Sequence, residues 1–221
     1  MTIGFSSVHA IALAAGCVTL ALLPVPAAAE PSRVYGTPSE DLAVQAMHNF
    51  AKCIVGRTPE GAEKVLAMDF RTKAYAQALH RIGKGHDSCM KNGDRMRSNN
   101  VLLAGGLAEA LMDAHGVTAH LARATGFDPT RPPLESRAPS ETVSLCIVRE
   151  APGKVATLFG TEPASEGENK AIQSLGATLV KCVPAGQTMK VNRSGLRATL
   201  ALAAYRAAQN NSPATTPASG S

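Results

Sequence analysis

Two stretches of this chain match at a cysteine, at the two apolar residues after it and at a proline: Cys53-Ile54-Val55-Gly56-Arg57-Thr58-Pro59 and Cys146-Ile147-Val148-Arg149-Glu150-Ala151-Pro152. The second stretch lies 93 residues after the first. The same offset places Cys89 on Cys182, so the two cysteines of each pair are 36 residues apart in both cases. A shared spacing of this kind indicates that one segment of the chain has been copied.

The offset of 93 also aligns glycines, asparagines and apolar residues downstream of the first cysteine, without a gap. The matched pairs include Ala78 and Ala171, Gly83 and Gly176, Gly93 and Gly186, Met96 and Met189, Asn99 and Asn192, Leu103 and Leu196, and Leu107 and Leu200. Turns, helix caps and helix cores depend on these residue types. We therefore interpret the chain after its first 29 residues as a tandem duplication.

The composition favours an all-helical fold. Hydrophobic residues make up 45% of the 221 residues and charged residues 18%, which excludes a wholly disordered chain. Aromatic residues make up only 4% and tryptophan is absent, so the core must consist mainly of Ala, Leu, Val, Ile and Met. Because Ala and Leu are strong helix formers, we expect an all-α protein.

Each copy is expected to form four helices, because four helix-start signals recur along it. These signals are the capping box at Thr37 to Glu40 and its counterpart near Pro139, then Pro59 and Pro152, Thr72 and Ser165, and Asn99 and Asn192. The third helix is expected to reach the second cysteine of its copy. The fourth helix of the first copy is expected to continue to about Ala124.

These elements divide the chain into five segments. They are a signal peptide over 1–29, helical repeat 1 over 30–125, a proline-rich connector over 126–138, helical repeat 2 over 139–208 and a disordered tail over 209–221. The predicted fold is thus all-α, with two tandem four-helix repeats, each with an internal disulfide.

The first 29 residues have the pattern of a secretory signal. Val8 to Leu23 is almost continuously apolar, and small residues follow it up to Ala29. Lys and Arg are absent before the apolar run, which is atypical of a signal. An uncleaved anchor and a lipid-modified Cys17 are the alternatives to cleavage after Ala29. Cleavage predicts a periplasmic or secreted protein with no transmembrane span after signal removal.

Four cysteines remain after the signal, Cys53, Cys89, Cys146 and Cys182, and an even number in an exported chain indicates disulfides. If the ancestral unit carried its own bridge, Cys53 pairs with Cys89 and Cys146 pairs with Cys182. In the rival arrangement Cys53 pairs with Cys146 and Cys89 with Cys182, which joins the copies covalently. Free catalytic or redox thiols are a further alternative, which the absence of a Cys-x-x-Cys motif disfavours.

The repeated pattern resembles a group of exported proteins of alphaproteobacteria, sphingomonads in particular. The resemblance rests on the Cys-Ile-Val stretch, the nearby proline, the Leu-rich helix that ends in a cysteine, and Leu196-Arg197-Ala198-Thr199-Leu200-Ala201. It covers both repeats, about two thirds of the chain. These motifs are structural, so the resemblance implies a lineage and a compartment and implies no activity.

Motifs for catalysis are sparse, and no catalytic residue, metal site or cofactor is predicted. Ser88 and Lys91 match the Ser-x-x-Lys of penicillin-recognising enzymes, but the Lys-Thr-Gly and Ser-Asp-Asn motifs of those enzymes are absent. Four histidines of the first copy have no histidine counterpart in the second, and we interpret them as solvated or partly buried residues rather than metal ligands. They are His80, His86, His115 and His120.

The candidate contact surface is basic. The net charge is +5, and seven basic residues lie between positions 71 and 97, with only Asp87 and Asp94 against them. They are Arg71, Lys73, Arg81, Lys84, Lys91, Arg95 and Arg97. If they share a face, they could bind anionic headgroups or acidic envelope polymers; a solvated helix surface is the alternative. Nucleic acid is not expected as a partner, because interleaved aromatic residues are absent.

These observations predict a binding or structural component of the bacterial envelope, whose partner is an anionic envelope component or another protein. The alternative is a periplasmic, hydrolase-like enzyme with a site in the groove between the repeats. Polar groups converging in that groove would favour catalysis, whereas a seam filled with Leu and Ala would favour a scaffold.

Overall fold

Ten α-helices and two short 3₁₀ helices form the part of the chain that the computed structural model describes, residues 38–90, 99–187, 189–190 and 192–212. No strand occurs in these residues, so the predicted all-α class is confirmed. The helices are α1 (Pro38–Arg57), α2 (Pro59–Ala67), α3 (Lys73–Lys84), α4 (Asn100–Ala114), α5 (Leu121–Thr125), α6 (Pro139–Glu150), α7 (Pro152–Phe159), α8 (Glu166–Ser174), α9 (Gly176–Cys182) and α10 (Arg193–Asn211). The 3₁₀ helices are η1 (Asp87–Cys89) and η2 (Thr118–His120).

Four of the polar N-caps predicted from the sequence are confirmed, and the remaining one, Thr37, lies outside the described residues. Thr72 Oγ1 accepts a hydrogen bond from Tyr75 N at 3.2 Å, and Ser165 Oγ accepts one from Glu168 N at 3.1 Å. The side-chain oxygens of Asn99 and Asn192 accept bonds from backbone N–H groups of α4 and α10 in the same way. Each cap satisfies a backbone donor that the first helical turn leaves without a partner.

Helix boundaries in the two halves agree at the offset of 93 residues. The offset carries the first residue of α2 onto that of α7, the first residue of α3 onto that of α8, and the first residue of α4 onto that of α10. It also carries the last residue of α1 onto the last residue of α6. The matched positions thus begin and end helices alike.

The expected third helix is interrupted in both halves. In the first half α3 ends at Lys84, and a separate 3₁₀ turn carries Cys89. In the second half the helix breaks at Leu175, and α9 carries Cys182. The prediction of one continuous helix up to each cysteine was therefore wrong. The apolar periodicity runs across both breaks and does not reveal them.

The first half's last long helix ends ten residues earlier than expected. Gly116 adopts φ +67°, a left-handed conformation, and stops α4 at Ala114. Gly116 N donates to Asp113 O at 3.0 Å, and Val117 N donates to Met112 O at 2.8 Å. This is the Schellman arrangement, which turns the chain away from the helix axis. The segment up to Thr125 then forms η2 and α5 instead of a continuation.

The last helix ends later than expected. Helix α10 continues through Asn211, three residues into the segment 209–221 that was expected to be disordered. Asn211 Nδ2 donates to Gly126 O at 2.6 Å, which ties this end of α10 to the connector. The rest of the tail, the signal segment 1–29 and the predicted turn at Gly93 lie outside the described residues. Gly186 is described and has φ +77° in a tight turn, as expected.

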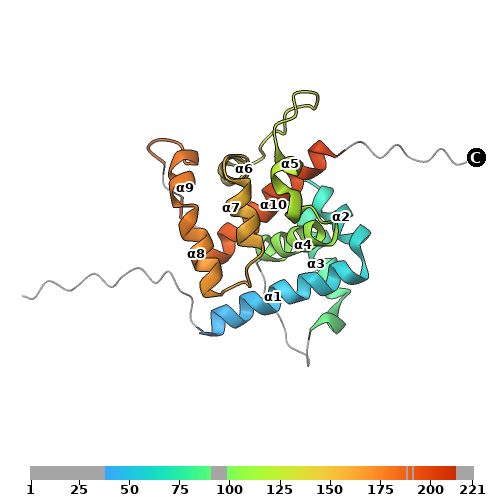
Figure 1. Ribbon diagram of the computed structural model, residues 1–221. Coiled ribbons are helices and arrows are strands. Elements are labelled where there is room, and N and C mark those ends of the chain that lie inside the picture. Colours follow the sequence, from blue (N-terminus) through green and yellow to red (C-terminus); the bar gives the residue numbers. More distant parts are fainter. Residues whose placement is uncertain (1–37, 91–98, 188, 191, 213–221) are drawn as a thin grey trace, which may run out of the picture. The chain divides into compact units, whose positions relative to one another are not determined.

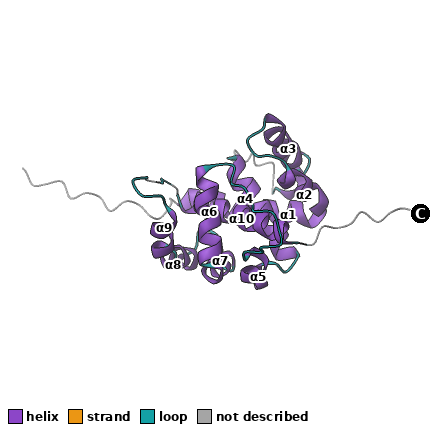
Figure 2. Ribbon diagram, turned by 90° about the horizontal axis from the view of Figure 1, so that it is seen from above, coloured by secondary structure: helices purple, strands orange, loops and turns teal. Residues whose placement is uncertain are grey.

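Helices α4 and α10 lie side by side in the middle of the described helices, with α2 and α3 on one side and α6 to α9 on the other (Figures 1 and 2). The two helices approach most closely at Gly105 of α4 and Ala198 of α10. Both helices are buried along most of their length, including Leu103, Leu107 and Leu111 of α4, and Leu196, Leu200 and Ala203 of α10. These are the apolar positions that the sequence predicted for the fourth helix of each copy. Helix α1 packs against α4, and α6 packs against α10.

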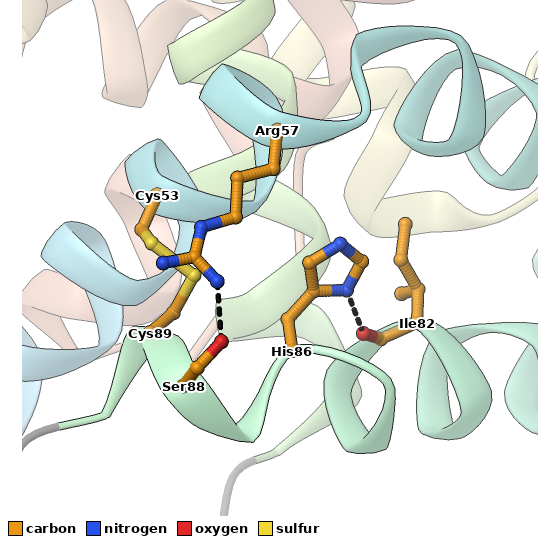
Figure 3. Close-up of a disulfide and its surroundings, with 6 residues drawn as sticks. All are labelled: Cys53, Arg57, Ile82, His86, Ser88 and Cys89. Carbon is orange, nitrogen blue, oxygen red and sulfur yellow. Dashed lines mark hydrogen bonds between the residues drawn. A yellow bond between two sulfur atoms is a disulfide. The ribbon is translucent and has the colours of Figure 1, made fainter.

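Each half contains its own disulfide, Cys53 to Cys89 and Cys146 to Cys182, with Cα atoms 5.8 and 5.7 Å apart. The preferred pairing is confirmed, and the rival pairing between halves is wrong. Figure 3 shows the first disulfide, which joins α1 to η1. Among the described residues, no helix is both long enough and apolar enough to span a membrane.

Candidate functional site

A cavity of about 160 Å³ lies where α2, α3, the start of α4, the start of α6 and α10 meet. Its walls therefore come from both halves of the chain. Most of the wall is apolar, and six larger side chains form it: Leu66, Met68, Phe70, Tyr75, Leu202 and Tyr205. We call this cavity the inter-half pocket.

One end of the inter-half pocket carries three charged side chains, Arg137, Glu141 and Arg206. The Arg206 guanidinium donates to Glu141 Oε1, and Arg137 N donates to Glu141 Oε2 at 2.6 Å. Among the described residues, the Arg137 guanidinium donates one hydrogen bond, to the carbonyl of Met68 at 3.4 Å. The single carboxylate is thus engaged by Arg206 and by the backbone, which leaves the guanidinium of Arg137 as an excess charge.

The surroundings of the pocket shift the pKa values of two of its side chains, Arg206 and Tyr75. Burial lowers the pKa of Arg206, and the nearby charge of Arg137 lowers it further. Burial raises the pKa of Tyr75 to about 12, so its hydroxyl keeps its proton and remains a donor at neutral pH. The pocket can therefore offer hydrogen-bond donors and positive charge beside a largely apolar surface.

A second polar cluster is buried between α4, α8 and α10, with Arg197 at its centre. Arg197 is 4% exposed, Glu109 is 5% exposed and Glu168 is fully buried. Arg197 Nε and Nη2 donate to the two carboxylate oxygens of Glu109 at 2.9 and 2.5 Å, and Nη1 donates to Glu168 Oε1 at 3.1 Å. Nη2 also donates to the carbonyls of Thr161 and Phe159, at 2.9 and 3.3 Å.

The cluster continues from Glu168 to the first helix. Glu168 Oε2 accepts from Ala164 N at 2.9 Å and contacts Arg193 Nε at 3.1 Å. Arg193 in turn pairs with Asp41 of α1. Because its ionic groups have opposite charges and hydrogen-bond partners, this cluster ties the halves together and offers no open position for a substrate.

His48 of α1 lies beside this cluster, with Nε2 3.8 Å from Glu109 Oε1. Burial lowers the pKa of His48 to about 4, and the positive charges of Arg197 and Lys52 contribute. Burial also raises the pKa of Glu109, against the opposing effect of Arg197. The cavity here is about 30 Å³, which holds little more than a water molecule. His48 and Glu109 thus have shifted pKa values, but the cavity beside them is too small for a ligand.

Of the seven basic residues predicted as a contact surface, four lie among the described residues. Arg71 is bonded to Asp69 through Nε at 3.0 Å and Nη2 at 2.6 Å, which holds the pKa of Asp69 well below its usual range. Lys91, Arg95 and Arg97 lie outside the described residues. Lys73, Arg81 and Lys84 are exposed on α3, where helical geometry places them within about 80° of one another around the axis.

Ser88 of the Ser-x-x-Lys motif is bonded to another side chain. Arg57 of α1 donates to Ser88 Oγ beside the Cys53–Cys89 disulfide (Figure 3), and Lys91 lies outside the described residues. His86 Nδ1 lies 2.8 Å from the carbonyl of Ile82 in the same view. Within the described ranges, no three His, Cys, Asp or Glu side chains are placed to hold a metal ion.

The sequence analysis named the groove between the repeats as an alternative site, but it identified neither the residues of the inter-half pocket nor the Arg197 cluster. Their residues come from positions far apart in the chain, and no local motif joins them. One signal was present: Arg197 and Glu109 are charged, whereas the matched positions in the other half are the apolar residues Ala104 and Leu202. Differences between aligned copies, rather than similarities, mark these sites.

Comparison of the chain with protein-family models, with curated protein sequences and with solved structures gives no match. The geometry of the pocket therefore carries the functional argument without support from a relative.

Proposed function

We propose that this chain is an exported binding protein of the bacterial envelope that holds a small ligand in the inter-half pocket. The observation that carries the proposal is the pocket itself, an apolar cavity with charged groups at one end. Ligand sites are typically concave and apolar with a few placed polar groups, and they often lie where two structural units meet.

Export is supported by the sulfur chemistry and by the N-terminal pattern. Two disulfides are expected in an oxidising compartment such as the periplasm and are rare in the cytosol. The apolar run and small residues before Glu30 have the order of a cleavable signal. The likeness to exported sphingomonad proteins is part of the same proposal.

The tandem duplication is also part of the proposal. Two copies related by an approximate two-fold axis would bring matched positions into contact at that axis. Gly105 of α4 and Ala198 of α10 are matched at the offset of 93, and they pack against each other. The matched helix boundaries and the matched disulfides support the same history.

Binding is favoured over catalysis by the state of the polar groups. At the seam between α4 and α10, Gly105 packs against Ala198, and the buried charges of Arg197, Glu109 and Glu168 are already paired. In the inter-half pocket Glu141 is bonded to Arg206 and to the backbone of Arg137. A hydrolase would need a general base with an available lone pair beside the substrate.

Ligand-observed NMR with the mature protein tests the binding function. Small aromatic compounds with neutral, anionic and cationic groups are the probes, and at least one is expected to bind. Thr199→Leu should abolish that binding, because Thr199 lines the pocket and a leucine would fill it. Thr199 Oγ1 bonds only within its own helix, to Leu196 O, so this change should leave the fold intact. Absence of binding by every probe would refute the proposed pocket function.

Cell fractionation tests the compartment separately. The expected product is a periplasmic or secreted protein that starts at Glu30 and contains both disulfides. A cytosolic product with reduced cysteines would contradict export, and a lipid on Cys17 would replace soluble release with anchoring.

The exposed basic face of α3 supports a second contact, with an anionic envelope polymer. Dextran sulfate is a suitable probe, and replacing Lys73 and Lys84 by Gln should weaken its binding more than replacing the exposed Lys154 and Lys181 by Gln does. Equal effects would indicate a general charge interaction without a specific surface.

A further inference from the structure

The inter-half pocket and the Arg197 cluster occupy matched places in the two halves. Arg197 corresponds to Ala104 at the offset of 93. Arg197 bonds to four residues, Glu109, Glu168, Thr161 and Phe159. At the same offset they correspond, in that order, to Leu202, Tyr75, Met68 and Leu66. All four of these counterparts line the inter-half pocket.

This correspondence relates the filled site of one half to the pocket that the other half lines. In the second half a long arginine side chain pairs with two carboxylates. In the first half the matched residue is Ala104, a buried and uncharged side chain of α4. The two carboxylates are replaced there by a leucine and a tyrosine, so a cation is not required. The hollow is therefore apolar where the filled site is acidic.

The charged end of the pocket differs in sign from the filled site. Arg137 and Arg206 contribute two positive charges and Glu141 contributes one negative charge. Asp69 is near enough to act on both arginines, but it is paired with Arg71. Glu135 enters only through its backbone carbonyl, which accepts from Arg206 at 3.4 Å. One positive charge remains in excess, and the Arg137 guanidinium has most of its five donors unused by the described residues.

We infer that the ligand of the inter-half pocket is a small apolar monocarboxylate, with its carboxylate bound by Arg137 and its apolar body between Leu66, Tyr75 and Leu202. Guanidinium groups bind carboxylates through paired N–H donors, and a half-buried position strengthens that contact. This inference rests on the proposed binding function and adds the chemical class of the ligand.

The size of the cavity limits the apolar body. A protein cavity of about 150 Å³ accepts a benzene ring, and the inter-half pocket is about 160 Å³. A single aromatic ring or a short alkyl chain fits this space, whereas a membrane lipid with two long acyl chains does not. The expected class is thus a phenylalkanoate or a short-chain fatty acid.

Isothermal titration of the mature, disulfide-bonded protein with three isosteric probes tests the inference. The probes are phenylacetate, phenylacetamide and phenethylammonium, which share the ring and differ in the charge of the head group. Phenylacetate is expected to bind at least tenfold more tightly than either of the others. Equal affinity for phenylacetate and phenylacetamide would overturn the carboxylate assignment while leaving the pocket function standing. Failure of all three probes would refute both.

Two variants locate the contact. Arg137→Gln should weaken phenylacetate at least tenfold and leave phenylacetamide unchanged, because only the charged contact is removed. Arg137 makes one long side-chain bond in the protein, so the variant should fold, and its unfolding midpoint without ligand checks this. Lys84→Gln is the matched control, since it removes the same charge from an exposed position on α3. An equal loss in both variants would show a general charge effect and would overturn the site.

Discussion

Arg197 shows how one buried side chain can connect two halves of a chain. Its guanidinium reaches Glu109 from α4, Glu168 from α8 and two backbone carbonyls, all within 3.3 Å. Burying three charges is costly unless each has its partners, and removing one partner leaves the others unpaired. The stability of the seam therefore depends on this residue more than its single position suggests.

Arg197→Met should lower the free energy of unfolding by about 3–5 kcal/mol, because it leaves buried Glu109 without its guanidinium partner and Glu168 with Arg193 alone as a cationic partner. Urea unfolding monitored by circular dichroism measures the change. The exposed pair between Lys181 and Glu150 is the control, and Lys181→Met should change stability by no more than about 0.5 kcal/mol.

A compensated variant separates charge from shape. Adding Glu109→Leu and Glu168→Gln to Arg197→Met removes the stranded charges and should recover most of the lost stability. If the triple variant were as unstable as the single one, loss of packing rather than loss of ion pairing would be the cause.

His48 predicts a pH dependence of stability. Its folded pKa of about 4 lies below the ordinary value of 6.5, so the unfolded chain binds a proton that the folded chain does not over this range. Stability should therefore fall as the pH falls from 6.5 to 4, and the His48 contribution at pH 4 is about 3 kcal/mol. His48 is 8% exposed, so solvent weakens this effect little.

The measurement is the free energy of unfolding of wild type and of His48→Gln at pH 7 and pH 4.5. Wild type should lose about 2 kcal/mol more than the variant over this interval. Glu109 contributes with the opposite sign, since a raised carboxyl pKa adds stability as the pH falls, but it is present in both proteins. Parallel curves would show that His48 is not held neutral by the fold.

At the scale of the helix, the sequence was informative where a local interaction sets the boundary. Thr72, Ser165, Asn99 and Asn192 act within three residues of their own positions, so their roles could be predicted. Gly116 carried an equally local signal, but the apolar and alanine-rich pattern after it favoured continuation. The breaks near Gly85 and Leu175 depend on how the cysteine-bearing turns meet α1 and α6, which are remote in sequence.

Each disulfide ties the ends of two elements that hydrophobic packing holds only partly. Helix α9 buries only Cys182 among its residues, and η1 buries none. Each bond closes a loop of 36 residues. The Cys53→Ala/Cys89→Ala variant should therefore lose about 4 kcal/mol through the gain in freedom of the unfolded chain.

The Cys146→Ala/Cys182→Ala variant provides the matched comparison, because its loop has the same length. Thermal unfolding under non-reducing conditions should give similar losses for both variants. A loss below about 1 kcal/mol in either one would mean that native contacts, and not the crosslink, hold that turn in place.

At the scale of the whole chain, the matched positions of the two halves predicted the fold, and the pocket and the Arg197 cluster lie where the matched residues differ. The matched cysteines, caps and leucines were sufficient for the class, the pairing and most helix starts. The pocket could not be predicted without knowing that α4 and α10 lie against each other. Only this contact places Ala104 and Arg197 in matched positions. Pairwise contact between remote helices is a tertiary property that one sequence does not state.

The close approach of α4 and α10 gives the last prediction. A Cβ added to Gly105 would lie 2.5 Å from the Cβ and 2.8 Å from the carbonyl oxygen of Ala198, distances that force the two backbones apart. Gly105→Ala should destabilise the protein by about 3 kcal/mol, near the upper end for overpacking in a core. Gly56→Ala is the control, because nothing lies within 4 Å of its added Cβ, and it should be neutral or stabilising by up to about 1 kcal/mol.

The swapped pair Gly105→Ala/Ala198→Gly tests the two-fold relation itself. If Gly105 and Ala198 face each other across a two-fold axis, exchanging them leaves one glycine opposite one alanine, as in the wild type. The double variant should then recover most of the stability that Gly105→Ala loses, as measured by urea unfolding. If it remained as unstable as the single variant, the halves would not meet as equivalent copies, and the matched origin assigned to the pocket and the Arg197 cluster would have to be abandoned.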